Sequence, residues 1–236
     1  MIDFTGQTVL VIGGSSGIGL ATARMAASLN AEVTIASRSL ERVERAMADI
    51  PSARGRAVDV TCDDSVEALF SDGRVWDHVI VTGSQVEMAA VRALPLDVAR
   101  AAVDSKFWGF YRVARVANIR PAGSLSVVAG FLATRPAATR ALMGAINGAL
   151  ESLVQGLALE LRPVRVNAVS PAMVQTEMWD GLEAGVRAEM FKKLAEHYPA
   201  GVIGRPDDIA RQLLLLAATP YATGTVVTLD GGASIA

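Results

Sequence analysis

The N-terminal part of the chain contains a short apolar run that ends in a cluster of glycines. Residues 9–12 (Val-Leu-Val-Ile) are typical of a strand buried on both faces of a parallel sheet. Gly13, Gly17 and Gly19 follow, and apolar residues recur at helical spacing from about residue 17. Free backbone N–H groups and the helix dipole attract anions at such a junction. The spacing G-x3-G-x-G differs from the G-x-G-x-x-G dinucleotide fingerprint, so a phosphate cradle and an ordinary tight turn both remain open.

Beyond this junction, short apolar runs alternate with segments of helical periodicity. Further strands are expected at residues 31–37, 56–60, 75–82, 124–128, 165–169 and 225–229. Helices are expected at residues 17–29, 40–50, 63–71, 95–118, 137–161 and 206–218. The alternation predicts an α/β fold in which helices cover both faces of a seven-stranded parallel sheet, with ligands beyond the carboxyl ends of the strands. Residues 171–200 are expected to form a mostly helical excursion that covers a pocket.

Composition narrows the class of protein. The 236 residues suffice for one sizeable core, so a single domain over residues 1–236 is expected, and 51% hydrophobic with 19% charged residues excludes disorder. A net charge of −2 gives no electrostatic footprint for nucleic acid or an anionic membrane. No run approaching about 20 apolar residues and no signal peptide is recognised, so a cytoplasmic protein is expected. One cysteine, Cys62, and two histidines predict neither a disulfide nor a metal site.

Five motifs resemble those of the classical short-chain dehydrogenase/reductase family, in the family's order and spacing. They are Gly13-x3-Gly17-Ile18-Gly19, Asp59-Val60-Thr61, Arg165-Val166-Asn167-x2-Ser170-Pro171, Gly204-Arg205-Pro206-x-Asp208-Ile209-Ala210 and Thr223-Gly224-x5-Asp230-Gly231-Gly232. The resemblance covers essentially the whole chain and implies a Rossmann-type, doubly wound domain that binds a nicotinamide dinucleotide. It also implies a homotetramer whose interfaces are formed by two long helices. Independently, small residues on the 137–161 helix suit either such an interface or close packing within one subunit, namely Ala141, Gly144, Ala145, Gly148 and Ala149.

The resemblance also implies roles in cofactor binding. Gly13, Ser15, Ser16 and Ile18 are expected along the pyrophosphate and the adenosine ribose, and Asp59 is expected to accept a hydrogen bond from the adenine amino group. The remaining residues expected around the cofactor are Gly17, Gly19, Ser37, Val60, Thr82, Gly83, Ser84, Pro171 and Thr176. Where NAD-preferring members tend to hold an acidic residue, this chain has Arg38, whose guanidinium suits a 2′-phosphate. NADP is therefore expected, although Arg38 also suits a plain surface position.

The catalytic residues of the family do not have counterparts in this chain. Family members use a serine, a tyrosine and, one helical turn after the tyrosine, a lysine whose charge lowers the phenol pKa. The corresponding positions hold Gly130, Met143 and Asn147. A fourth family residue, an asparagine on the preceding long helix, corresponds to Lys106. The cofactor motifs are thus better preserved than the groups that move the proton.

Three interpretations follow. The first is an NADP(H)-dependent oxidoreductase that acts on a small carbonyl or alcohol substrate by hydride transfer, in which Lys106 lies beside Asn147 and replaces the usual proton relay. The second is a catalytically silent NADP(H)-binding sensor or partner subunit, and the third a structural oligomer without cofactor. Lys106 also suits an ion pair with Asp104 or with a partner subunit's carboxylate.

Further candidate proton donors are Thr134, Arg135, Thr139 and Arg140. An apolar pocket, or else ordinary core packing, is expected for Phe131, Met143, Met173, Met178, Trp179 and Met190.

Overall fold

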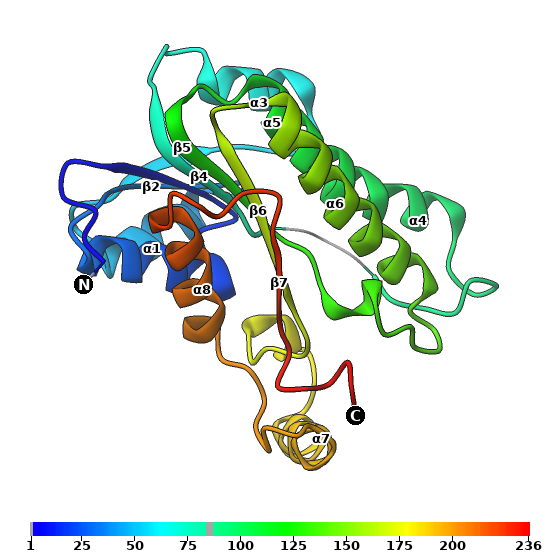
Figure 1. Ribbon diagram of the computed structural model, residues 1–236. Helices are drawn as coiled ribbons and strands as arrows, with labels where there is room; N and C mark the ends of the chain where they lie inside the picture. Colours follow the sequence, from blue (N-terminus) through cyan, green and yellow to red (C-terminus); the bar gives the residue numbers. More distant parts are fainter. Residues whose placement is uncertain (1, 84–86) are drawn as a thin grey trace.

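The structure is a computed structural model that describes residues 2–83 and 87–236. Seven parallel strands form one sheet in the order β3-β2-β1-β4-β5-β6-β7 (Figure 1). The strands are β1 (Thr8–Ile12), β2 (Glu32–Ser37), β3 (Arg54–Ala57), β4 (Trp76–Val81), β5 (Ile119–Val128), β6 (Arg165–Pro171) and β7 (Val226–Leu229). The strand order reverses beside β1, which is the Rossmann-type doubly wound arrangement with its ligand crevice at the switch point. The predicted fold class is confirmed.

Helices cover both faces of this sheet. The α-helices are α1 (Gly17–Ser28), α2 (Leu40–Ala48), α3 (Asp63–Phe70), α4 (Leu96–Val103), α5 (Gly109–Val116), α6 (Ala141–Glu160), α7 (Ala184–His197) and α8 (Pro206–Ala218), of which α7 lies away from the sheet (Figure 1). In Figure 1, α1 and α8 lie on one face, and α3, α4, α5 and α6 lie on the other. Alternate residues of β1 serve the two cores: Val9 and Val11 pack toward α1 and α8, whereas Leu10 and Ile12 pack toward α5 and α6. This burial on both faces explains the continuous apolar run in β1.

Four predicted boundaries are wrong, and each has a local cause. The third strand covers 54–57 rather than 56–60, because the chain turns where Asp59 accepts hydrogen bonds from Thr61. The fifth strand begins at Ile119, which pairs with Trp76 across a register irregularity. The second long helix begins at Ala141 instead of 137, after Thr139 takes a left-handed φ of 62°. The first long helix, expected over residues 95–118, is interrupted by a π-helical turn, η1 (Asp104–Trp108). This turn ends just before Gly109, the residue at which an interruption is expected.

The prediction that no stretch is long and apolar enough to span a membrane is wrong for helix α6. Within residues 2–83 and 87–236, it is the one helix that meets this test by length and composition, and 33% of the tested window is buried. The packing of the fold accounts for this composition. Leu150 and Val154 are fully buried against the sheet, whereas the small residues Ala141, Ala145 and Ala149 occupy exposed positions.

Candidate active site

The glycine-rich turn connects β1 to α1 at the carboxyl ends of β1 and β4. Gly13 has a φ of 84°, and a Cβ atom there would lie 2.3 Å from the backbone nitrogen of Gly83. A Cβ atom on Gly19 would lie 2.2 Å from the carbonyl oxygen of Gly13 and 2.5 Å from Oγ1 of Thr82. Both positions therefore require glycine because backbone segments approach each other closely. The structure thus brings Gly13, Gly19, Thr82 and Gly83 into close contact, while Ser84 lies outside the described residues.

The N-terminus of α1 is suited to an anion. Ser16 precedes the helix in an extended conformation and its side chain forms no capping hydrogen bond. The first turn of α1 itself contains no acidic residue, and the carboxylate nearest to it in the structure is that of Glu177, which lies beside Gly17. Ser15, Gly17 and Ile18 are partly exposed at the same turn. Free N–H groups and a positive dipole end at an accessible turn are the properties of a phosphate-binding site.

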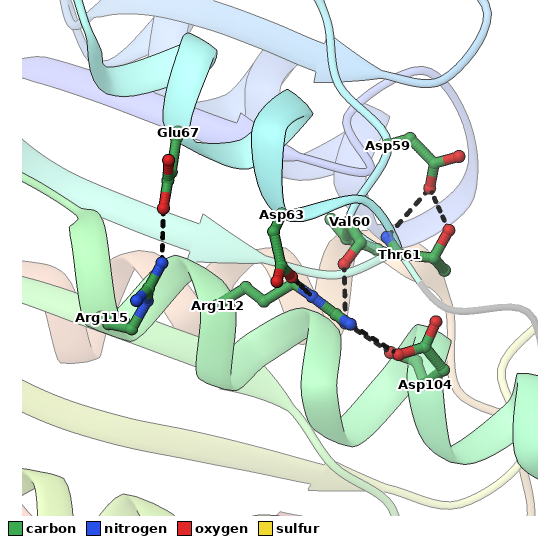
Figure 2. A network of polar contacts seen from close by, with 8 residues as sticks. All are labelled: Asp59, Val60, Thr61, Asp63, Glu67, Asp104, Arg112 and Arg115. Carbon is green, nitrogen blue, oxygen red and sulfur yellow. Dashed lines mark hydrogen bonds and ion pairs between the residues drawn. The ribbon is translucent and has the colours of Figure 1, made fainter.

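The predicted adenosine-binding residues lie at the ends of β2 and β3. Arg38 is exposed just after Ser37, the last residue of β2, and its charge acts on Asp59. Burial raises the pKa of Asp59, but hydrogen bonds from the Thr61 backbone and hydroxyl and the charges of Arg38 and Arg112 outweigh it, so this pKa lies below its ordinary value. Oδ1 of Asp59 accepts both bonds from Thr61, at 2.9 and 2.7 Å. Its other oxygen has no hydrogen-bond partner among the described residues (Figure 2).

Figure 2 shows that Arg112 of α5 ties this loop to the π turn. Its guanidinium donates 2.8 Å to Oδ1 of Asp104, 3.3 Å to the carbonyl oxygen of Val60, and also to Asp63. Burial lowers the pKa of Arg112, but the carboxylates of Asp63 and Asp104 reverse the direction and raise it. The side chain is only 20% exposed, so these ion pairs hold the elements in register more firmly than a surface pair does. Because Asp104 binds Arg112, the predicted alternative of a Lys106–Asp104 pair is wrong.

Lys106 lies in the π turn and points to the end of β5. Single π turns re-aim side chains within a helix and are frequent at functional sites. The Nζ atom donates 2.7 Å to Oδ1 of Asn147 and 3.0 Å to the carbonyl oxygen of Ala129, and it lies 3.9 Å from the sulfur of Met143. Burial lowers the pKa of Lys106 to about 8, and the charge of Glu151 opposes this shift. The predicted proximity of Lys106 to Asn147 is therefore present as a direct hydrogen bond.

Gly130 and Asn147 share one space. A Cβ atom built on Gly130 would lie 2.6 Å from Nδ2 of Asn147, so the amide occupies the volume that a side chain at position 130 would need. Asn147 itself is only 2% exposed. Gly130 follows Ala129, the residue whose carbonyl oxygen accepts the bond from Lys106. These contacts connect Lys106, Met143, Asn147 and Gly130 into one cluster at the carboxyl end of β5.

Comparisons with known proteins identify the family. A family model described as enoyl-(acyl carrier protein) reductase matches residues 12–234. The chain belongs to the classical short-chain dehydrogenase/reductase family. It is 32% identical to the short-chain dehydrogenase/reductase ATR9 of Stachybotrys chlorohalonatus over 99% of both chains, and 31% identical to galactitol 2-dehydrogenase (L-tagatose-forming) of Cereibacter sphaeroides over 98% of this chain and 96% of the relative.

Solved structures of short-chain dehydrogenase/reductases share this fold. A small-chain dehydrogenase in complex with NADPH is 31% identical and superposes with a TM-score of 0.83 over 98% of this chain and 99% of its own. The NADPH-bound short-chain oxidoreductase of Pseudomonas aeruginosa PAO1, described as containing an atypical catalytic center, superposes with a TM-score of 0.89 over the whole of both chains. At 23% identity, the second likeness shows the fold alone.

Within this short-chain dehydrogenase/reductase, the further candidate donors do not gather at Lys106. Thr134 donates to the carbonyl oxygen of Phe131 at 3.1 Å, and Arg135 donates to that of Ser234 at 3.5 Å. Arg140 contacts the sulfur of Met88, and Thr139 occupies the left-handed turn before α6. The structure therefore leaves Lys106 as the charged group of this cluster among the residues it describes.

The structure places the residues of the predicted apolar pocket on several separate segments. Met143 contacts Lys106, whereas Met178 is 66% exposed and Trp179 donates its ring N–H 3.0 Å to the carbonyl oxygen of Val174. Phe131, Met173 and Met190 are partly buried on three separate segments: η2 (Phe131–Ala133), the loop after β6, and α7.

The segment after β6 lies against the glycine-rich turn. A Cβ atom on Gly17 would lie 3.3 Å from the Thr176 side chain and 3.4 Å from a carboxylate oxygen of Glu177, and Pro171 ends β6 just before this segment. A cavity of about 500 Å³ lies between α1, α7 and the start of α8, with Gly17, Thr176 and Glu177 in its wall. Thr176 thus lies beside Gly17 of the glycine-rich turn, and its contact with a cofactor stays a prediction. Sequence reasoning missed Glu177, because no motif signals that its carboxylate faces the turn.

Proposed function

We propose that this short-chain dehydrogenase/reductase is an NADP(H)-dependent oxidoreductase that interconverts a small carbonyl compound and its alcohol, with Lys106 as the proton donor and acceptor. The observation that carries this proposal is the 2.7 Å hydrogen bond between Nζ of Lys106 and Oδ1 of Asn147. It supplies a positioned, titratable ammonium at the carboxyl end of β5, the edge of the sheet where ligands of this fold bind.

The residues of the crevice suit a nicotinamide dinucleotide. The close approach at Gly13 and Gly19 forms a cradle that any Cβ atom would fill, and the N–H groups of α1 would hold the pyrophosphate. Asp59, with one unpaired carboxylate oxygen, would accept the bond from the adenine amino group. The exposed guanidinium of Arg38 would hold a 2′-phosphate, which supports NADP over NAD. The NADPH complex of the relative that is 31% identical agrees with this assignment. When bound, the reduced nicotinamide supplies a hydride.

Lys106 accounts for the proton that accompanies this hydride. An ammonium beside a carbonyl oxygen stabilises the negative charge that develops there, and it then donates a proton to give the alcohol. Asn147 and the Ala129 carbonyl oxygen hold Nζ in one position, so both act as positioning groups. The pKa of about 8 makes the amine a useful acid near neutral pH and a useful base slightly above it.

Compared with the family pattern, the amide and the ammonium have exchanged helices, and this exchange supports Lys106 as the proton donor. In the family pattern, the amide lies on the first long helix and the ammonium on the second. Here Lys106 lies in the π turn of the first, and Asn147 lies on α6, the second. The same two groups thus meet from opposite helices. Met143 and Gly130 provide neither the phenol nor the hydroxyl of the family, so Lys106 acts on the substrate oxygen without them.

A homotetramer assembled through α6 is part of the proposal. Ala141, Ala145 and Ala149 form an exposed strip of small side chains along α6, and such a surface can meet its symmetry mate closely. Gly144 allows close packing within the subunit instead, because a Cβ atom there would lie 2.7 Å from the carbonyl oxygen of Leu132 in the same chain. Sedimentation equilibrium tests the assembly. A fourfold mass is expected, and replacing Ala145 by Glu is expected to dissociate the α6 contact.

Two measurements test the function. Titration with NADPH and with NADH, followed by nicotinamide fluorescence, is expected to show binding of both and tighter binding of NADPH. A screen of small aldehydes, ketones and their alcohols then tests turnover by the absorbance of the reduced nicotinamide. Binding without turnover across the screen would favour the catalytically silent alternative. No binding of either nucleotide would overturn the proposal.

A further inference from the structure

We infer that Glu177 lowers the affinity of the glycine-rich turn for dinucleotides, and that its carboxylate turns toward Arg205 when a pyrophosphate binds. The inference rests on the proposed binding of a nicotinamide dinucleotide and deepens it, because it names two residues that set the affinity. Neither residue is among those expected around the cofactor.

The carboxylate of Glu177 lies beside the first residue of α1. A Cβ atom on Gly17 would lie 3.4 Å from Oε2 of Glu177 and 3.3 Å from the Thr176 side chain. Gly17 begins α1, whose first N–H groups would hold the pyrophosphate. Within residues 2–83 and 87–236, no hydrogen-bond or ion-pair partner neutralises this carboxylate. A pyrophosphate at this turn would therefore meet an uncompensated negative charge, which opposes its binding.

The backbone that carries Glu177 is held on both sides. Before it, Val174 pairs with Gly204 in a parallel bridge, and the N–H of Gln175 donates 2.9 Å to the carbonyl oxygen of Gly204. After it, the indole N–H of Trp179 donates 3.0 Å back to the carbonyl oxygen of Val174. These contacts fix the main chain beside the turn. The repulsion is therefore relieved most readily by rotation of the Glu177 side chain, which is exposed.

A cavity beside Glu177 provides a second position for the carboxylate. This cavity of about 500 Å³ lies between α1, α7 and the start of α8, and its wall includes both Glu177 and Arg205. The other two arginines of the wall already have carboxylate partners, in the pairs Arg24–Asp49 and Arg187–Asp180. Arg205 has no ion-pair partner in the part of the chain that the structure describes. Its guanidinium is therefore free to pair with the Glu177 carboxylate once that group leaves the turn.

Two charge effects follow, and they are coupled. Removing the Glu177 charge is expected to tighten nucleotide binding, because this carboxylate then no longer opposes the pyrophosphate at the turn. Removing the Arg205 charge is expected to weaken binding, because the displaced carboxylate loses its partner. The second effect depends on the first, since Arg205 has no displaced carboxylate to neutralise when Glu177 is absent. The two changes are therefore not additive.

Isothermal titration calorimetry of the full-length protein with NADPH and with NADH tests the first effect. In Glu177→Gln, the Kd of both nucleotides is expected to fall by at least about threefold at about 0.05 M salt, because both carry the pyrophosphate. The gain is expected to shrink at about 0.5 M salt, since mobile ions screen exposed charges. Glu196→Gln is the matched control, because it removes an exposed carboxylate of α7 outside the cavity wall and should leave both Kd values unchanged.

A double-mutant cycle tests the second effect. Arg205→Gln is expected to raise the Kd for NADPH by at least about threefold in the wild-type background and by less than about 1.5-fold in Glu177→Gln. Equal factors in the two backgrounds would show that Arg205 acts on the nucleotide directly, and they would overturn its pairing with Glu177. An unchanged or higher Kd in Glu177→Gln, with folding verified by circular dichroism, would overturn the inference as a whole.

The outcomes also separate this inference from the proposed function. Nucleotide binding that does not respond to Glu177→Gln overturns the inference and leaves the proposed oxidoreductase unaffected. Absence of NADPH and NADH binding in the wild type and in every variant overturns both, because the carboxylate then opposes nothing.

Discussion

Nζ of Lys106 lies 2.7 Å from Oδ1 of Asn147, and this hydrogen bond joins the π turn before α5 to the first half of α6. The same asparagine fills the space next to Gly130, so three positions that differ from the family pattern depend on one another. This interdependence distinguishes a rearranged site from one that has merely lost its catalytic groups. Each of the following predictions tests one part of this arrangement.

Gly130→Ala is expected to disrupt the cluster. Its methyl group would lie 2.6 Å from Nδ2 of Asn147, so the amide must move and its bond to Lys106 is lost. We expect turnover to fall by at least about tenfold, which corresponds to about 1.4 kcal/mol, with little change in NADPH affinity. Gly156→Ala, on α6 where an added Cβ atom meets nothing within 4 Å, is the control and should keep its activity. Full activity in Gly130→Ala would show that the amide position is unimportant.

Arg38→Glu is expected to lose the preference for NADPH. The guanidinium can pair with a 2′-phosphate, whereas a carboxylate repels the phosphate and accepts hydrogen bonds from ribose hydroxyls. The Kd for NADPH is expected to rise by at least about tenfold while that for NADH changes little. Arg42→Glu, an exposed change of the same charge on α2, controls for the general electrostatic effect. If Arg38→Glu keeps its preference for NADPH, the 2′-phosphate binds elsewhere.

The rate of carbonyl reduction is expected to depend on pH through Lys106. The ammonium is the proton donor, and its pKa is lowered to about 8, so the rate should fall as pH rises through 8. Alcohol oxidation needs the neutral amine and should rise over the same range. In Asn147→Asp, the added carboxylate favours the ammonium, so both transitions should move to higher pH. Initial rates between pH 6 and 10 check this, and identical profiles for the two directions would contradict it.

His78 is expected to make the fold sensitive to acid. It is buried on β4 between Oγ of Ser124 and Oε1 of Gln7, each at 2.8 Å, and burial lowers its pKa to about 4. The unfolded chain binds this proton near pH 6.5 and the folded protein only near 4, so stability is complete above 6.5 and is lost as the pH falls between these values. The loss amounts to at most about 3.4 kcal/mol.

Urea unfolding between pH 4 and 7 measures this contribution. His78→Gln removes the titrating group, so its free energy of unfolding should vary less with pH than that of the wild type, although the variant is less stable overall. His197→Gln, on exposed α7, leaves His78 intact and should retain the wild-type slope. A wild-type slope in His78→Gln would assign the acid sensitivity to other groups.

Local patterns predict much of the fold. The strand at Thr8–Ile12 and the helix at Pro206–Ala218 follow from apolar periodicity and from a proline at the helix start. The π turn at Asp104–Trp108 does not, because the hydrogen bonds of Arg112 to Asp104, Asp63 and Val60 bring together segments distant in sequence. That turn carries Lys106. Alignment with the family motifs predicts that Lys106 lies near Asn147, whereas the hydrogen bond between them is evident only in the tertiary structure.

The close packing of Asn147 against Gly130 also could not be predicted from the sequence. A glycine in the place of a serine reads as the loss of a functional group, and only the structure shows that the Asn147 amide uses the vacated volume. The same holds for Glu177, whose carboxylate lies beside the glycine-rich turn because η3 (Glu177–Trp179) folds back over α1. Such packing relationships depend on contacts across many residues and have no local signature.

The most direct test of Lys106 as the proton donor is the single-turnover rate of NADPH oxidation by Lys106→Ala, with the enzyme in excess over NADPH and a saturating carbonyl substrate from the screen. The proton donor is removed while the cradle at Gly13–Gly19 is untouched. We expect a rate at least about tenfold below that of the wild type, a loss of at least about 1.4 kcal/mol of transition-state stabilisation, with an unchanged Kd for NADPH. A wild-type rate in the folded variant would contradict the assignment of Lys106 as the proton donor.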